Sequence, residues 1–240
     1  MTTYFIADLH LDEKRPAVTR AFFDWLAQIE GDCKALYILG DFFEVWIGDD
    51  DDDPFHRRLL QRLAKFSASG VPLAVMPGNR DFLLGAGFAA ASGARLLQDP
   101  TTIDLYGETV LLMHGDTLCT RDTEYMAFRE LARSAQWQAD LLAKPLAQRR
   151  AIAAELRRQS KSMTSLKAED IMDVTPQEVE RVMRQFGVQT LIHGHTHRPD
   201  NHALSIDNQR ARRIVLGDWG ELGWCLKVTR SSRELVSWPV

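Results

Sequence analysis

The sequence has few of the features that mark secreted, membrane-spanning or nucleic-acid-binding proteins. Its three cysteines are far apart in 240 residues and show no metal-binding spacing, so we expect buried, reduced thiols in a cytosolic protein. The first residues, MTTYFIADLH, lack the basic start and long apolar run of a signal peptide. No stretch approaches the ~20 apolar residues that cross a bilayer. The formal net charge of −4 gives no reason to expect nucleic acid as a partner.

Short apolar runs alternate with helix-like segments along most of the chain. Runs of strand length occur at 4–7, 35–39, 72–76, 109–113 and 190–193. Between them, segments such as FHRRLLQRLAKFSA repeat apolar residues at helical spacing. This alternation predicts one α/β domain, spanning 1–240, with a largely parallel sheet. Near the C-terminus, RRIVLGDW and GWCLKVTR look like consecutive strands joined by a Gly-rich turn, which predicts antiparallel pairs at the end of the sheet.

Residues 121–170 break this alternation, because helical periodicity continues throughout them with one interruption at Pro145. This segment carries 10 Lys and Arg against 7 Asp and Glu, a net charge of +3 that leaves −7 for the rest of the chain. A basic helical insertion in an acidic domain suggests a cap over an anionic ligand. A solvated helical hairpin explains the charge equally well.

Metal-competent side chains follow five of the predicted strands. They are Asp8, His10, Asp41, Asn79, His114, His195 and His197. Ligands of open α/β sheets lie beyond the carboxyl ends of strands, so these residues can converge on one point. Asp8 and His10 lie two apart, as do His195 and His197, so on an extended chain each pair points to one side and can clamp a metal.

Seven ligands are too many for one ion, but they suit two ions that share a bridging carboxylate. Such a centre holds a hydroxide and clamps phosphoryl oxygens during in-line attack. Each motif alone is weak, yet five of the seven histidines lie in these motifs. In order, D-x-H, G-D, G-N, H-G-D and G-H-x-H resemble the motifs of the calcineurin-like metallophosphoesterases across nearly the whole chain.

The longer motifs resemble one bacterial branch of that family. They are FIADLHL, LGDFFEVWIGDD, PGNRDFL, LMHGD, RDTEY, SKSMTSLKAEDIMDV and LIHGHTHRP. Enzymes of this branch cleave the pyrophosphate of UDP-2,3-diacylglucosamine in lipid A synthesis, by attack of a metal-bound hydroxide on the α phosphorus. The products are UMP and 2,3-diacylglucosamine 1-phosphate. The resemblance implies a four-layer α/β/β/α sandwich with a helical cap insertion at about 121–170, and two Mn²⁺ ions per chain.

The resemblance also implies roles for individual residues. Asp8, His10 and His197 would bind one ion, Asn79, His114 and His195 the other, and Asp41 would bridge them. Asn79, Arg80 and His114 would be catalytic. The implied substrate contacts are Asn79, Arg80, Asp122, Ser160, Thr164, Lys167 and His195. Ligand chemistry alone allows Mn²⁺, Fe²⁺ or Zn²⁺. His193 precedes the G-H-x-H pattern, and we expect a structural or supporting role for it.

Arg80 stands where the wider family usually has histidine. That histidine is thought to help an alkoxide leave, whereas the leaving group of a pyrophosphate is a stable anion that needs little protonation. A guanidinium supplies a permanent charge and planar donors instead. We therefore predict that Arg80 favours phosphoanhydrides. The alternative is an inert loop residue paired with Asp81.

The cap segment also carries an apolar stripe and a basic cluster. The stripe consists of Tyr125, Met126, Phe128, Leu131, Ala132, Trp137, Leu141 and Leu142. The basic residues include Arg149, Arg150, Arg157, Arg158, Lys161 and Lys167. Such a stripe is ordinarily the core of a helical hairpin, but the resemblance favours a groove for the acyl chains of a UDP-diacyl-sugar. It further implies a monomer in peripheral contact with the cytoplasmic face of the bacterial inner membrane.

Two neighbouring features are interpreted as structural. The acidic run 48–54 lacks the glycine and glutamate positions of a calcium loop, so we predict a solvated loop followed by a helix at or just after Pro54. Trp46 is expected to pack, with a supporting or nucleotide-stacking role left open.

Two other functions remain to be distinguished from the leading one. A soluble nucleotide pyrophosphatase or phosphodiesterase on the same scaffold would not need an apolar helical cap. A non-catalytic metal-binding scaffold would be free to lose ligands, whereas all seven are present here.

Overall fold

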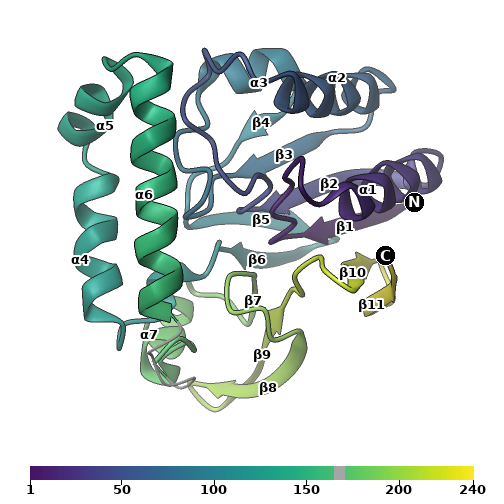
Figure 1. Ribbon diagram of the computed structural model, residues 1–240. Helices are drawn as coiled ribbons and strands as arrows, with labels where there is room; N and C mark the ends of the chain where they lie inside the picture. Colours follow the sequence, from purple (N-terminus) through teal and green to yellow (C-terminus); the bar gives the residue numbers. More distant parts are fainter. Residues whose placement is uncertain (165–170) are drawn as a thin grey trace.

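The computed structural model describes residues 1–164 and 171–240. Two β-sheets pack face to face, and three cap helices stand together at one side of them (Figure 1). Strands precede helices along most of the N-terminal half, as the alternating apolar pattern predicts.

The first sheet has the strand order β11-β10-β1-β2-β3-β4. Its members are β1 (Thr2–Ile6), β2 (Cys33–Leu39), β3 (Leu73–Met76), β4 (Arg95–Leu96), β10 (Leu222–Val228) and β11 (Arg233–Pro239). Strands β1 to β4 pair in parallel, while β10 joins β1 and β11 antiparallel. The carboxyl ends of β1, β2 and β3 therefore lie along one edge.

The second sheet has the order β5-β6-β7-β9-β8. Its members are β5 (Thr101–Leu105), β6 (Glu108–Leu112), β7 (Thr190–His193), β8 (Asp200–Ile206) and β9 (Gln209–Val215). Strands β6, β7 and β9 pair in parallel, flanked by antiparallel β5 and β8. Each sheet is thus mixed, with a parallel part that delivers polar loops to the site.

Alternation of side chains along the strands produces the layers. In β1, Ile6 packs into the cluster that includes Phe22 of α1, whereas Phe5 faces the second sheet. In β6, Leu112 faces the first sheet and Leu111 packs on Val182 of α7. Because successive side chains of a strand point to opposite faces, both sheets are covered on two sides. The α/β/β/α sandwich follows directly.

The helices that cover the sheets start and stop where local chemistry dictates. Against the first sheet pack α1 (Pro16–Ile29), α2 (Pro54–Ala68) and α3 (Ala86–Ser92), while α7 (Pro176–Phe186) covers the second. Helix α2 begins at Pro54 as predicted, with the Asp53 carboxylate accepting a hydrogen bond from the Phe55 amide. Helix α7 ends at Gly187, which adopts a left-handed conformation.

The predicted antiparallel pairs at the C-terminal end are confirmed, because β10 pairs antiparallel with β1 and β11. The segments RRIVLGDW and GWCLKVTR form β9 and β10, but the expectation that they are neighbours joined by a turn is wrong, because the two strands lie in different sheets. The linker between β9 and β10 contains Trp219, whose backbone amide donates to the Asp8 carbonyl. A short Gly-rich linker at a sheet edge resembles a hairpin turn in sequence, because local composition does not reveal which sheet the next strand joins.

The cap consists of α4 (Thr123–Ala132), α5 (Ala135–Leu142) and α6 (Leu146–Thr164), with the predicted interruption at Pro145 between the last two. In Figure 1 the helices stand close together and the long α6 runs beside the edge of the sandwich. Among the described residues, no helix combines the length with the apolar character that a bilayer span requires.

Candidate metal centre and adjoining cavity

The seven candidate ligands all follow strands in the described structure. Asp8 and His10 come after β1, Asp41 after β2, Asn79 after β3, His114 after β6, and His195 and His197 after β7. The parallel strands of both sheets therefore deliver their loops to one place. The interatomic distances below show how closely these side chains meet.

The backbone of these loops is not extended, although the two-residue spacing of each ligand pair was interpreted on the assumption of an extended chain. Asp8, His10, Asp41, His195 and His197 all have positive φ, between 47° and 70°. L-residues other than glycine adopt this left-handed conformation at a cost, and such strain gathers at functional sites. The chain therefore bends at the ligand positions after β1, β2 and β7, where an extended chain would continue straight.

An outer cluster consists of Asp8, His10 and His197, whose ligand atoms all lie within 4.8 Å of one another. Nε2 of His10 and Nε2 of His197 are 3.3 Å apart, and Asp8 Oδ1 lies 3.7 Å from the latter. Asp8 Oδ1 is buried and has no hydrogen-bond partner among the described residues. A buried carboxylate oxygen facing two imidazole nitrogens fits a divalent cation.

An inner cluster consists of Asp41, His114 and His195, again within 4.8 Å of one another. The amide oxygen of Asn79 joins it, at 2.9 Å from His114 Nε2 and 3.0 Å from His195 Nδ1. Two ring nitrogens and an amide oxygen converge there on a fully buried carboxylate. The donor set again suits a divalent cation and contains no thiolate.

Asp41 faces both clusters. Its Oδ2 lies 3.8 Å from His10 Nε2, and its Oδ1 lies 3.7 Å from His114 Nε2. The backbone amide of Arg80 donates to Oδ1 at 2.8 Å, which fixes the orientation of the carboxylate. Asp41 thus approaches imidazole nitrogens of both clusters, whereas Asp8 approaches the His197 ring and accepts from the His195 backbone amide at 2.8 Å.

The two histidines of the G-H-x-H motif separate, so the expectation that this pair clamps one metal is wrong. His195 belongs to the inner cluster and His197 to the outer one. Both have positive φ, and the turn between them sends the rings to different sides. The division matches the one implied by the family resemblance.

Burial and mutual charge determine the electrostatics of the site. Burial raises the pKa of the Asp8 carboxyl, although His197 and His114 act in the opposite direction. Burial alone would lower the pKa of His114, yet Asp41, Asp116 and Asp8 raise it to about 9. For His195, burial and the neighbouring His114 lower the pKa to about 4. The buried negative charge here favours a cation.

Asp81 is a buried residue of this site whose role the sequence pattern did not reveal. Its carboxylate accepts hydrogen bonds from the amides of Phe42 and Phe43 at 2.8 and 3.2 Å, and from Gly78 at 2.7 Å. It therefore ties the loop after β2 to the loop after β3. Asp81 forms these hydrogen bonds in place of the ion pair with Arg80 that was the alternative prediction. Burial raises the pKa of Asp81 to about 6.

Carboxylates also stand behind the outer histidines. Glu44 Oε2 lies 3.2 Å from His10 Nδ1, and Asp218 Oδ2 lies 3.7 Å from His197 Nδ1. Glu44 lies within the LGDFFEVWIGDD motif, but the motif did not reveal this contact, and only the fold brings the two carboxylates to the rings. The structural role expected for His193 agrees with its position, because it is fully buried and its Nδ1 bonds to the Gly194 carbonyl at 2.8 Å.

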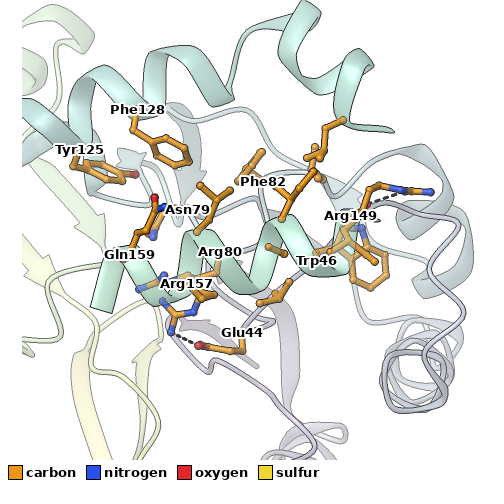
Figure 2. A pocket seen from close by; sticks show the side chains of 18 of the residues that line it. Glu44, Trp46, Asn79, Arg80, Phe82, Tyr125, Phe128, Arg149, Arg157 and Gln159 are labelled. Atoms are coloured by element: carbon orange, nitrogen blue, oxygen red, sulfur yellow. Dashed lines mark hydrogen bonds and ion pairs between the residues drawn. The ribbon is translucent and has the colours of Figure 1, made fainter. Parts of the chain in front are cut away.

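A cavity of about 360 Å³ lies between the cap and the loops that carry Glu44 and Asn79. Both polar and apolar side chains line it (Figure 2). The polar lining includes Asn79, Arg80, Asp122, Tyr125, Gln159 and Ser160. The apolar lining includes Phe82, Leu83, Phe128, Trp137, Leu141 and Ile152. Asn79 belongs to both the cavity and the inner cluster, so the two features are continuous.

The predicted substrate contacts fall into three groups. Asn79, Arg80, Asp122 and Ser160 line the cavity. His195 lies beside Asn79 in the inner cluster. Lys167 lies outside the described residues, and Thr164 is described only as the last residue of α6.

The predicted apolar stripe is only partly a groove. Tyr125, Phe128, Trp137 and Leu141 line the cavity, but Leu131 and Leu142 are exposed to 55% and 41%. Met126 lines a separate shallow depression, and Ala132 is buried. The stripe divides because the chain turns between α4 and α5, so one helical periodicity does not continue through both helices.

Much of the basic charge in the cap is already paired within the protein. Arg149 is buried and donates to the Ile47 carbonyl at 2.8 Å as well as to Asp50. Arg150 pairs with Asp51 and Asp52. The acidic run is a loop with Asp49, Asp50 and Asp52 exposed, as predicted, and its ion pairs also anchor the cap. The Lys161 side chain, like Lys167, lies outside what the structure describes.

Trp46 is 4% exposed and packs against Phe43 and Phe88, with its indole nitrogen donating to Asp49 at 3.2 Å. Asp49 in turn accepts from the amides of Gly85 and Gly87. The predicted packing role of Trp46 is confirmed.

Comparison with known proteins places this geometry in a family. Residues 1–199 match the model of the calcineurin-like phosphoesterases. A UDP-2,3-diacylglucosamine hydrolase of Cellvibrio japonicus is 56% identical over 240 residues, covering 100% of both chains. One of Pseudomonas aeruginosa strain UCBPP-PA14 is 52% identical over the same full coverage. Among solved structures, an archaeal phosphodiesterase aligns over 100% of both chains with a TM-score of 0.53 at 11% identity, which shows a shared fold.

Proposed function

The chain belongs to the calcineurin-like phosphoesterases, in the family of the UDP-2,3-diacylglucosamine hydrolases, and we propose on that basis that it hydrolyses the pyrophosphate bond of UDP-2,3-diacylglucosamine. It is a metal-dependent hydrolase that uses divalent cations. The proposed products are UMP and 2,3-diacylglucosamine 1-phosphate, an intermediate of lipid A biosynthesis. The whole chain would act as one domain whose cap spans about 121–170.

The proposed cofactors are two Mn²⁺ ions. Asp8, His10 and His197 would hold one, and Asn79, His114 and His195 the other, with Asp41 shared between them. The unpartnered Asp8 Oδ1 and the approach of Asp41 to histidines of both clusters support this assignment. When bound, such a pair lowers the pKa of water and neutralises charge on phosphoryl oxygens.

The protein's own side chains would then orient the pyrophosphate. Arg80 lines the cavity next to Asn79, and its Nε is buried without a hydrogen-bond partner among the described residues. A buried guanidinium nitrogen of this kind is suited to a phosphate oxygen, and its planar donors fit a diphosphate better than a neutral ester. Its backbone amide meanwhile holds Asp41 at 2.8 Å.

The cavity would hold the acyl chains. Its lining combines polar side chains such as Asn79 with apolar ones such as Trp137 and Leu141, and Figure 2 shows Arg80 and Phe82 on this lining. Burying apolar chains there while the phosphates stay beside Asn79 would align the pyrophosphate with the metal centre.

The continuity of the metal centre with a partly apolar cavity carries the proposal. It favours a lipid substrate over the soluble nucleotides of the second candidate function. The third candidate, a non-catalytic scaffold, does not explain why every candidate ligand in the described structure is present and converges.

Hydrolysis of the lipid substrate in H₂¹⁸O tests the proposal. We expect label in UMP, because attack on the α phosphorus places the new oxygen there, and much slower turnover of soluble UDP-sugars. Label in the sugar phosphate would contradict the assigned point of attack. Turnover of UDP-glucose as fast as that of the lipid would favour the soluble pyrophosphatase. If metal-loaded protein hydrolysed neither the lipid nor UDP-sugars, the non-catalytic scaffold would be favoured.

We further propose that the protein works as a monomer in peripheral contact with the cytoplasmic face of the inner membrane. Exposed Leu131 and Leu142 on the cap support this contact, because such side chains can enter the interfacial region of a bilayer. Replacing both with serine should reduce sedimentation with anionic vesicles while metal binding stays unchanged. Undiminished sedimentation would contradict this role of the cap.

A further inference from the structure

Glu44 lies between a metal-cluster histidine and the cap. One of its carboxylate oxygens, Oε2, is 3.2 Å from Nδ1 of His10. The other, Oε1, accepts a hydrogen bond from Arg157 of α6, drawn as a dashed line in Figure 2. One side chain thus contacts both the outer cluster and the cap helix that forms a wall of the cavity.

The backbone around Glu44 is tied to the loop that carries His10. The Leu11 amide donates to the Phe42 carbonyl at 3.0 Å, and the Glu44 amide donates to the Leu11 carbonyl at 3.1 Å. His10 itself donates from its amide to the Asp41 carbonyl at 2.9 Å. These bonds make the two loops one unit, so the position of Glu44 relative to the His10 ring is set by the backbone.

A carboxylate behind an imidazole has a defined effect. With the proton held on Nδ1, the lone pair of Nε2 faces away from the carboxylate. In this structure Nε2 of His10 faces Nε2 of His197 at 3.3 Å and Asp41 at 3.8 Å. Nδ1 of His10 is buried and forms no hydrogen bond among the described residues, and the Glu44 carboxylate 3.2 Å away is the acceptor positioned to hold its proton.

The same Glu44 carboxylate also pairs with Arg157. This arginine lines the cavity together with Arg80 and is 31% exposed, and its pairing with Glu44 crosses from the cap to the body of the protein. The Arg149 guanidinium is held by backbone carbonyls as well as by a carboxylate. Arg157, in contrast, pairs with the carboxylate of Glu44. The position of this guanidinium at the cavity thus depends on Glu44.

We propose that Glu44 is a positioning residue that couples the outer metal cluster to the cap, by orienting His10 with one oxygen and Arg157 with the other. In this arrangement Arg157 presents its remaining donors to an anionic group of the substrate. The substrate-binding part of this inference rests on the proposed function, whereas the metal-binding part does not.

A double-mutant cycle of Glu44→Gln and Arg157→Gln tests the coupling. Affinity for Mn²⁺ is measured by calorimetry on substrate-free protein, and kcat and KM are measured separately on the lipid substrate. We expect Glu44→Gln to weaken Mn²⁺ binding at one site about tenfold or more, as loss of a carboxylate behind a ligating histidine does. Arg157→Gln should raise KM about tenfold with little change in kcat.

A non-additive effect of the two substitutions on KM would show that Glu44 acts on the substrate through Arg157. Glu44→Gln should raise KM severalfold in the native background but leave KM unchanged once Arg157 is already glutamine. Its effect on Mn²⁺ affinity should persist in both backgrounds, because His10 is oriented by the other oxygen. Unchanged Mn²⁺ affinity in Glu44→Gln, or additive effects on KM, would overturn the proposal.

Glu178→Gln and Arg181→Gln are matched controls. These two residues pair with each other on the surface of helix α7, so the substitutions are identical in kind but affect no contact with the metal clusters or the cavity lining. Both should leave Mn²⁺ affinity and KM unchanged. Should Glu44→Gln fail to fold, Glu44→Asp replaces it in the cycle with the same expected directions, because its shorter side chain reaches less far. Failure of the wild type to cleave the lipid would count against the proposed function, while the Mn²⁺ measurement would still decide the role of Glu44.

Discussion

The outer and inner clusters contain the same kinds of side chain, but the protein supports them differently. In the inner cluster His114 is 0% exposed, and its Nδ1 bonds to the Leu39 carbonyl at the end of β2. In the outer cluster His197 is 40% exposed, and the group facing its Nδ1 is the carboxylate of Asp218 at 3.7 Å. Burial and a backbone carbonyl order His114, whereas a side-chain carboxylate beside solvent faces His197.

This difference bears on how firmly each proposed ion is held. Ligands fixed by the backbone lose little freedom when they bind a cation, whereas exposed ligands must be ordered at the same moment. We therefore expect the inner cluster to bind more tightly and to exchange its ion more slowly. The four predictions below test this contrast in order of decreasing effect.

His114→Ala should have the largest effect. It removes an inner ligand and leaves the buried Leu39 carbonyl without its partner, which costs about 1–3 kcal/mol of stability. We expect kcat to fall by on the order of 10³-fold, and the Tm to drop as well. Steady-state kinetics and thermal unfolding check this, with His202→Ala on strand β8 as the control. Activity that excess Mn²⁺ restores would contradict the assignment of His114 to the tighter cluster.

His197→Ala should cost less and should be partly reversible. Because this histidine is exposed, water can replace it, so we expect about a 10²-fold loss of activity and a smaller change in Tm. Raising the Mn²⁺ concentration should recover much of the loss. If His197→Ala proves as damaging and as irreversible as His114→Ala, the two clusters do not differ in the way described here.

Removal of metal from the unmodified protein should proceed in two steps. Dialysis against increasing chelator, followed by metal analysis, should show one ion leaving at a concentration about tenfold lower than the other, in keeping with the affinity effect of outer-shell groups. Release of both ions in one step would contradict unequal clusters. In His197→Ala the early step should disappear, which identifies it with the outer cluster.

Asp218→Asn should have the smallest effect. The carboxylate lies 3.7 Å from His197 Nδ1 and is 40% exposed, so solvent weakens its influence on the ring. We expect a loss of Mn²⁺ affinity of roughly threefold, less than that of Glu44→Gln, whose carboxylate is closer and more buried. Asp207→Asn, at an exposed surface ion pair, serves as the control. An effect of Asp218→Asn larger than that of Glu44→Gln would reverse this order.

Features carried by short stretches of sequence were predicted well. The central strands, the start of α2 at Pro54, the helical cap and the order of polar strand ends all follow from local periodicity and local residue chemistry, whereas β4, β5, β8 and β11 were not predicted. The candidate ligands could be identified because each follows its own strand. Their roles as ligands to two ions remain a prediction.

Features that depend on distant contacts were not accessible from the sequence. Nothing local to Asp81 shows that three amides from two loops surround its carboxylate. Arg149 and Asp50 are each unremarkable surface residues by type, and only the packing of the cap on the body buries Arg149 and brings it to the exposed Asp50. The separation of β9 from β10 has the same origin, since sheet membership is a long-range property.

The left-handed backbone at the ligand positions also has a consequence for how the sequence can change. Each such residue costs on the order of 1 kcal/mol that glycine would not. At Asp8, His10, Asp41, His195 and His197, drift toward glycine would therefore relieve strain in the folded chain, and only the chemistry of the site opposes it. In a gene copy no longer selected for activity, we would expect the ligands to be lost first at these positions. The product would keep the fold with less backbone strain but would be inactive.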